Sequence, residues 1–159
     1  MKKVLYILLV MLLSACGFKP IYSGDTTDIY VEPISGINGI DLRNALRSKF
    51  GGQHTADAKY TLTVSLDEPL TQYKALEQTG DATWQEISLV ARYSLKSDGV
   101  QIASGTERVA ESYTFVSYLV ASNAAYNNAV QNAIRVLAEE IGTRAIAETY
   151  KHQKQSAVK

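Results

Sequence analysis

The sequence predicts an α+β fold, a two-layer sandwich in which a four-stranded, mainly antiparallel sheet packs on two helices in the order β-α-β-β-β-α. Three stretches, 58–67, 82–96 and 100–115, alternate apolar and polar residues with a period of two, as strands with one buried face do. Two others, 42–50 and 118–150, carry a single apolar stripe at helical spacing. Because one apolar sheet face and two such helices can cover each other, they are expected to form two layers around one core.

The first 15 residues have the organisation of a secretory signal peptide. Lys2 and Lys3 precede an apolar run, Val4 to Leu13, that is too short to cross a bilayer as a helix. The run leads into Leu13-Ser14-Ala15-Cys16, which resembles the lipobox of bacterial lipoproteins at all four positions. That resemblance implies cleavage before Cys16, a thioether-linked diacylglycerol on its sulfur, and an acylated amine.

Cys16 is the only cysteine, so a lipid on its sulfur leaves the mature domain without a disulfide. Two or more acyl chains give stable membrane attachment, whereas one chain binds reversibly. The alternatives are an ordinary secretory peptide with Cys16 as a chance free thiol, or an uncleaved anchor helix. We interpret 1–15 as a lipoprotein signal peptide and 16–27, rich in Gly, Ser, Asp and Thr, as a lipidated tether.

A strand over 28–34 and a short helix over 42–50 are expected to open the folded domain. The strand alternates apolar and polar residues, and Gly36 and Gly39 are expected to form the turn that follows it. Asp41 is a suitable N-cap, because its carboxylate can accept hydrogen bonds from the first free N–H groups of a helix. The helix has one apolar face and is basic on the others.

The next strand, 58–67, alternates cleanly, with leucine and valine on one face and threonine and serine on the other. Pro69 interrupts it, and 70–76 is expected to continue it as a bent extension. The threonine-rich face matters for function, because no further helix remains in the chain to cover that side of the sheet.

A long hairpin is expected next, with strands over 82–96 and 100–115. They flank Asp98 and Gly99, a dipeptide that is the strongest short-range signal for a two-residue hairpin turn. The alternation of the second strand slips near Ser104-Gly105, where we expect a β-bulge.

The last element is expected to be a helix of about 25 to 30 residues within 118–150, which is almost free of helix breakers. Ser122 or Asn123 is a plausible cap. Residues 152–159 are expected to be a flexible polar tail. The folded part of the chain is then one domain over 28–151.

Composition and motifs argue against catalysis. Sixteen basic residues balance sixteen acidic ones, which does not favour binding to nucleic acid. The only histidines, His54 and His152, have no metal-ligand partner at helical or hairpin spacing. The chain also lacks a nucleophile elbow, a phosphate-binding loop and a dinucleotide fingerprint. We therefore expect no enzymatic activity, no cofactor and no metal.

A small cationic patch is predicted on the polar face of the sheet by strand parity. Its members are Lys74, Arg92, Lys96 and Arg108. Counting from the Asp98-Gly99 turn places Arg108 across from 88–93. Such a patch could hold phosphate groups, since the arginine fork matches phosphate geometry. The alternative is that these are solvated side chains that balance Glu86, Glu107 and Glu111.

The expected start of the mature chain, Cys16-Gly17-Phe18-Lys19-Pro20-Ile21-Tyr22, resembles the opening of the LptE family of lipopolysaccharide-assembly lipoproteins. The predicted order of elements is also similar to that family. The resemblance implies a lipoprotein anchored through Cys16 in the inner, periplasmic leaflet of the outer membrane. It would sit inside the LptD β-barrel, plug it, help it assemble, and contact lipopolysaccharide.

Two other functions are compatible with the sequence. Some auxiliary lipoproteins of ABC-type lipid transporters have a similar size and α+β layout, and such a protein would have its partner in the periplasm or inner membrane. An orphan structural lipoprotein would have neither partner. No residue motif of the LptE family maps onto Lys74, Arg92, Lys96 or Arg108, so the assignment of lipopolysaccharide contact to them rests on strand parity.

Overall fold

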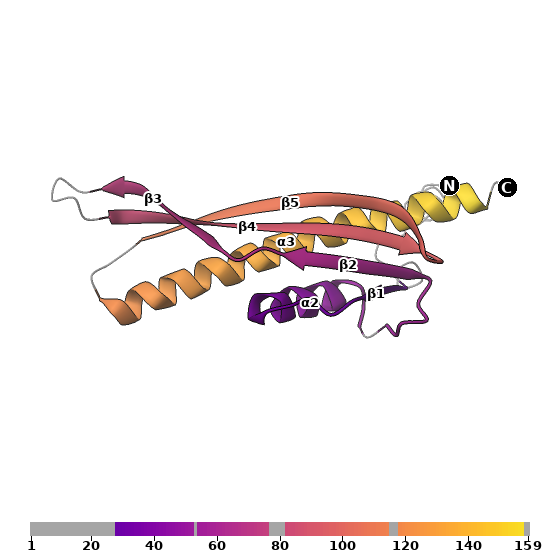
Figure 1. Ribbon diagram of the computed structural model, residues 1–159, viewed down its shortest axis with the longest axis horizontal. Helices are drawn as coiled ribbons and strands as arrows, with labels where there is room; N and C mark the ends of the chain where they lie inside the picture. The colour runs from indigo at the N-terminus through magenta and orange to yellow at the C-terminus, as the bar shows by residue number, and fades with distance from the viewer. Residues whose placement is uncertain (1–27, 53, 77–81, 115–117, 158–159) are drawn as a thin grey trace, which may run out of the picture.

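The computed structural model describes residues 28–52, 54–76, 82–114 and 118–157. The signal peptide, Cys16 and the tether lie outside the described residues. The elements are, in chain order, β1 (Ile29–Val31), α2 (Ile37–Lys49), β2 (Tyr60–Leu66), β3 (Leu70–Leu76), β4 (Ala82–Ser97), β5 (Val100–Thr114) and α3 (Leu119–Ser156). The predicted two-layer α+β fold is confirmed, with both helices on the same side of the sheet (Figure 1). The sheet has five strands where four were predicted.

The fifth strand arises because the segment before Pro69 and the segment after it are separate strands along the same edge of β4. β2 pairs antiparallel with residues 91–97 of β4, and β3 pairs antiparallel with 82–88. The predicted bent extension is therefore confirmed. Between Leu66, which faces Ala91, and Leu70, which faces Ser88, the register shifts by one residue. Proline cannot donate to the ladder, which accounts for the break.

The hairpin of β4 and β5 turns where the sequence predicts. Asp98 and Gly99 both have positive φ, 50° and 80°, as a type I′ turn requires. The bulge lies closer to the turn than predicted: Gln101 faces Lys96 and Ala103 faces Leu95, which leaves Ile102 as the extra residue. The prediction of a bulge at Ser104-Gly105 is wrong.

Gly105 interrupts the alternation for a different reason. A Cβ atom on Gly105 would lie 2.7 Å from the phenolic oxygen of Tyr93 on the paired strand. The glycine therefore makes room for the tyrosine ring, which is a use of glycine at close approach.

Helix α2 begins four residues earlier than Asp41, so the predicted N-cap is wrong. Gly36 precedes it with φ 84° and accepts a hydrogen bond from Ile40 N–H at 3.1 Å. Gly39, predicted in a turn, is buried inside the helix. Its missing side chain lets the helix pack on Ile34, because a Cβ there would lie 2.8 Å from Ile34 Cγ2.

Helix α3 has 38 residues, so it is longer than predicted and spans about 57 Å. It begins at Leu119 without a side-chain cap, so the predicted caps Ser122 and Asn123 are wrong, and it continues to Ser156. Only its middle and end carry the apolar stripe. Among its first residues, Ser122 is buried and most others are exposed.

The core lies between the inward face of the sheet and both helices. Its fully buried side chains come from β1, β2, β4, α2 and α3 and include Ile29, Tyr60, Leu62, Leu89, Leu95, Leu42, Leu46, Ile134, Leu137 and Ile141. Odd-numbered residues of β4 point into this core and even-numbered ones point away. The outward face is therefore the serine- and threonine-rich face that the sequence predicts. No other described segment covers it (Figure 1).

Candidate functional site

The open face of the sheet holds all four basic residues that the sequence singles out. Register places Arg92 across from Thr106 and Arg108 across from Val90, so Arg92 and Arg108 are diagonal neighbours, with side chains about 7–8 Å apart at their bases. Lys96 lies four residues further along β4, about 13 Å from Arg92. The structure thus brings the two arginines together and leaves Lys96 near the hairpin turn.

Arg92 is already engaged by a carboxylate. Its Nη1 donates to Asp67 Oδ1 at 2.7 Å and its Nη2 donates to Asp67 Oδ2 at 3.0 Å. These hydrogen bonds hold the pKa of the Asp67 carboxyl below its ordinary value and raise the pKa of the guanidinium. Asp67 sits at the kink between β2 and β3, so the pair also ties that junction to β4. A ligand on Arg92 would have to share it with Asp67.

Lys74 is similarly paired and lies apart from the arginines. Its Nζ is 2.9 Å from Glu86 Oε1, six residues along β4 from Arg92 and hence about 20 Å away. By contrast, Lys96 and Arg108 make no ion pair with any described residue. The alternative interpretation, in which acidic residues balance the cations, therefore holds for Lys74, while Arg92 is balanced by Asp67.

The surroundings of Arg108 are small and hydroxylated. On the same face lie the neighbouring side chains Ser65, Ser88, Ser94, Ser104, Thr106 and Ser112. Ser94 donates to Gln101 Oε1 at 2.9 Å beside Lys96. Chemically, this face offers one free guanidinium fork, one free ammonium group and a row of hydroxyls, which can bind phosphate or sugar oxygens.

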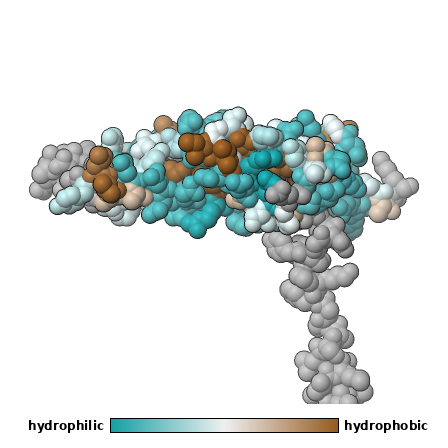
Figure 2. All heavy atoms as spheres, turned by 90° about the horizontal axis from the view of Figure 1, so that it is seen from below, coloured by the Kyte–Doolittle hydropathy of each residue, from teal (hydrophilic) through white to brown (hydrophobic). Residues whose placement is uncertain are grey.

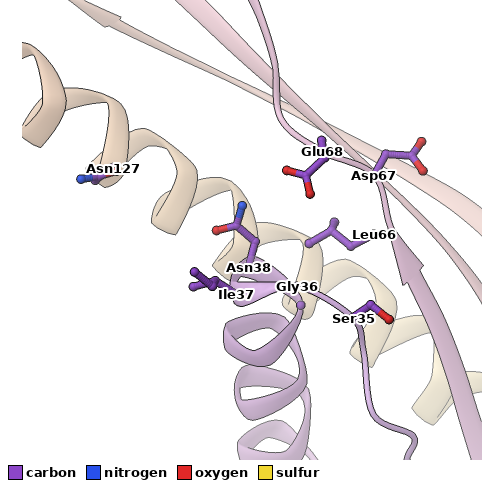
Figure 3. A pocket seen from close by; sticks show the side chains of 9 residues that line it. Ser35, Gly36, Ile37, Asn38, Leu66, Asp67, Glu68 and Asn127 are labelled. Carbon is purple, nitrogen blue, oxygen red and sulfur yellow. The ribbon is translucent and has the colours of Figure 1, made fainter.

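A hollow that the sequence does not reveal lies where β2 kinks into β3. It has a volume of about 490 Å³ and is lined by 35–39 at the start of α2, by 66–68 and by Asn127 of α3. In Figure 3, the side chains of Glu68 and Asn38 face the space between the helix and the kink, whereas Asp67 points away. No local signal in the sequence could indicate it, because three distant segments form it.

Exposed apolar side chains lie on both sides of the molecule: Leu70 and Trp84 are on the open face of the sheet, and a second set is on the helix side. Ile37 and Ile40 at the start of α2 are 82% and 56% exposed, and Leu119 and Val120 at the start of α3 are 74% and 83% exposed. Figure 2, seen from that side, shows hydrophobic atoms in the middle of the molecule and near one end. The two exposed pairs, Ile37 with Ile40 and Leu119 with Val120, are not part of the buried core.

Both histidines contact other residues of the folded domain. His54 Nδ1 lies 3.3 Å from Asp28 Oδ1, and its Nε2 lies 3.1 Å from the carbonyl oxygen of Phe50. His152 packs edge-on against the buried ring of Tyr60. In the described part of the chain, no three histidine, cysteine or acidic residues are grouped as metal ligands. Within that same part, no helix is both long and apolar enough to cross a bilayer.

Comparison with known proteins places these observations in a family. The LptE family model, described as lipopolysaccharide-assembly, matches residues 26–145. No curated protein sequence matches the chain.

Solved structures share the fold. A protein from Caulobacter crescentus CB15 aligns with a TM-score of 0.65 at 18% identity, over 82% of this chain and 96% of that chain. Rare lipoprotein B from Shewanella oneidensis aligns with a TM-score of 0.60 at 14% identity, over 79% and 98%. A minor lipoprotein from Acinetobacter baumannii aligns with a TM-score of 0.57 at 18% identity, over 77% and 92%. At these identities the likeness shows the fold alone.

Proposed function

Because the chain belongs to the LptE family of lipopolysaccharide-assembly lipoproteins, we propose that it binds, plugs and helps to assemble an LptD-like β-barrel in the outer membrane. Family membership itself gives the coarser statement: a non-enzymatic lipoprotein of the cell envelope with a role in lipopolysaccharide assembly. The barrel partner, the plug and the outer-membrane site are the proposal.

The uncovered face of the sheet is the observation that most supports a plug. A globular protein with helices on only one side of a mainly antiparallel sheet can expose the other face to water if that face is polar. The lumen of a wide membrane barrel is polar and water-filled. A body with a serine- and threonine-rich face can therefore fill such a lumen without burying unpaired polar groups.

The lipid anchor is the second part of the proposal. A signal peptide over 1–15 and acyl chains on Cys16 would attach the body to the periplasmic leaflet of the outer membrane. The tether of 16–27 is long enough to span about 40 Å when extended, so the body can reach a barrel lumen from the leaflet. Labelling with a radioactive fatty acid tests this: a Cys16→Ser variant labelled as strongly as the wild type would exclude it.

Contact with lipopolysaccharide is proposed to centre on Arg108 and Lys96. Both cations are free of ion pairs within the described chain, and their face carries hydroxyls that suit a phosphorylated saccharide. Arg92 would contribute less to this contact, because its guanidinium already donates two hydrogen bonds to Asp67. Lys74, paired with Glu86, is the weakest of the four candidates.

Copurification tests the barrel partner. The full-length tagged protein, extracted from membranes in a mild detergent, should carry with it a β-barrel protein of much larger mass. Recovery of an inner-membrane ABC transporter instead would favour the auxiliary-lipoprotein function. Recovery of the protein alone, under conditions that keep other membrane complexes intact, would refute both.

Charge reversal tests the lipopolysaccharide contact. Arg108→Glu and Lys96→Glu should each reduce the lipopolysaccharide that coelutes with the purified protein. Arg135→Glu is the matched control, because Arg135 is also exposed but lies on α3, away from the open face of the sheet. Equal losses in the control and the test variants would show that only net charge matters.

A further inference from the structure

β5 is an edge strand, and no described segment pairs with its outer side. It runs for 15 residues and pairs only with β4 in the described sheet. The opposite edge is shorter and divided: β1, with three residues, lies beside β2, and β3, with seven residues, pairs only with β4 in the described sheet. An edge of this length presents a row of unpaired backbone groups that can template another strand.

The direction of those groups follows from one hydrogen bond. The N–H of Asp67 donates to the carbonyl oxygen of Val90 at 2.9 Å, so the polar backbone groups of Val90 point toward the β2–β3 edge of β4. Val90 faces Arg108, and this pair therefore makes no mutual backbone hydrogen bond. The N–H and C=O groups of Arg108 consequently point to the free edge. The register is uninterrupted from Ser104 to Thr114, so every even-numbered residue of this stretch does the same.

These outward residues, which we call the edge row, carry little that would keep another strand away. The edge row consists of Ser104, Thr106, Arg108, Ala110, Ser112 and Thr114, and all six are exposed. Proteins usually protect such an edge with charged side chains, above all lysine, with proline or with a bulge. The edge row has no lysine or proline and one charge, Arg108, and the bulge at Ile102 comes before it. The acidic residues Glu107 and Glu111 alternate with the row and face the helix side, where Glu107 pairs with Arg144 at 2.9 Å.

We propose that an extended segment of the barrel partner adds to the edge row as a further strand, with an acidic side chain opposite Arg108. This inference rests on the proposed function, since it names how the barrel is held. The backbone groups select an extended chain, and the guanidinium of Arg108 selects an acid. Its five N–H donors are enough to bind a carboxylate and still donate to a phosphate oxygen of lipopolysaccharide.

A second copy of the chain fits the edge less well. Antiparallel pairing of two edge rows about their middle would place Arg108 of one copy diagonal to Arg108 of the other. Like charges at that spacing oppose pairing. The same argument favours a partner segment that brings the opposite charge.

Hydrogen exchange at single-residue resolution tests the inference on the full-length complex. In the free protein, amides of the edge row should exchange fast while the odd-numbered amides of β5, bonded to β4, are protected. In the complex with the barrel, the edge-row amides should exchange at least about tenfold more slowly. The odd-numbered amides are an internal control. Edge-row amides that stay fast in the complex would overturn the inference.

A proline substitution gives an independent test. Ala110→Pro removes an N–H that points away from β4, so the ladder with β4 remains and thermal unfolding should confirm that the domain folds. Ala110→Ser, which keeps the N–H, is the matched control. The proline variant should bind the barrel roughly tenfold more weakly than the serine variant. One hydrogen bond between the strands is lost, and the carbonyl group of the partner strand that would accept it is left without a donor.

The outcomes separate this inference from the proposed function. If wild type and Ala110→Pro recover the barrel equally, the edge-strand contact is wrong and the plug function stands. If the wild type recovers no barrel, the proposed function fails and the inference fails with it. If the free protein is a dimer by light scattering and Ala110→Pro is a monomer, the edge binds a second copy, and a barrel segment is excluded as its occupant. If Ala110→Pro does not fold, the exchange experiment decides.

Discussion

Two glycines inside helices should respond oppositely to alanine, and the reason lies in what surrounds each one. Replacing glycine by alanine in a helix interior normally stabilises by about 1 kcal/mol. A Cβ on Gly39 would lie 2.8 Å from Ile34 Cγ2 and 3.0 Å from the carbonyl carbon and oxygen of Ile34. The backbone of Ile34 is held between β1 and α2, so the strain cannot be relieved by rotating one side chain. Overpacking of this kind costs about 1–3 kcal/mol.

Gly142 is the matched control. The three atoms nearest to a Cβ on Gly142 all belong to the flexible side chain of Lys49, which can give way by rotating about its own bonds. Doing so moves a side chain that is only 9% exposed and loosens its ion pair with Glu139, whose side chain is 70% exposed, so the loss of that pair costs about 0–1 kcal/mol. Gly142→Ala should therefore be neutral or slightly stabilising, whereas Gly39→Ala should be destabilised by about 1 kcal/mol after the gain in helix propensity.

Urea denaturation of both variants in the same soluble domain, without the lipid anchor, measures the difference in the free energy of unfolding. Gly39→Ala should be less stable than Gly142→Ala by about 1–2 kcal/mol. Equal stabilities, or a more stable Gly39→Ala, would refute the claim that close packing on Ile34 sets the start of α2.

Three shorter predictions follow from single contacts. NMR titration should give Asp67 a pKa below its ordinary 3.8, and Arg92→Gln should return it toward that value; any stability from this pair is present above that pH and is lost as the pH falls through the lowered pKa. Arg144→Met should destabilise the domain by about 2 kcal/mol in urea, because it leaves the buried Glu107 carboxylate without its partner. Gly99→Ala should cost about 1–2 kcal/mol, since Gly99 has φ 80°, and no change in unfolding midpoint would contradict the type I′ turn.

Local signals are enough to place the outward arginines. Asp98-Gly99 fixes the hairpin turn, and counting from it puts Arg108 across from Val90, within the predicted range of 88–93. The single residue that the count leaves uncertain is the bulge, and its position at Ile102 depends on how Gln101 and its neighbours pair. Strand parity at Arg108 survives that error because the predicted bulge and the observed one both lie between the turn and Arg108, so one extra residue is counted in either case.

Contacts between distant segments could not be predicted in the same way. Gly39 reads as a turn residue because glycine weakens helices, and only the approach of Ile34 explains why it lies inside α2. Arg92 reads as a free cation because Asp67 is 25 residues away and reaches it only through the kink between β2 and β3. The hollow beside that kink is hidden from the sequence for the same reason.

The β4–β5 hairpin separates the residues that build the fold from those that meet the surroundings. Odd-numbered residues of β4, such as Leu89 and Leu95, are buried, so their identities are set by packing against the helices. Even-numbered residues of β4 and β5 face away from the core and form the open face, and those of β5 from Ser104 to Thr114 are the edge row. The small hydroxylated side chains of the edge row contribute little to the core. Stability of the fold therefore does not explain why a monomer would keep a long edge strand with so little protection against pairing. Binding offers a better explanation: an edge covered by a partner strand needs no protection, and hydroxyl groups on the open face can form hydrogen bonds with the polar wall of a lumen. Substitutions in the two rows should accordingly act on different quantities, the odd row on the free energy of unfolding and the even row on recovery of the barrel.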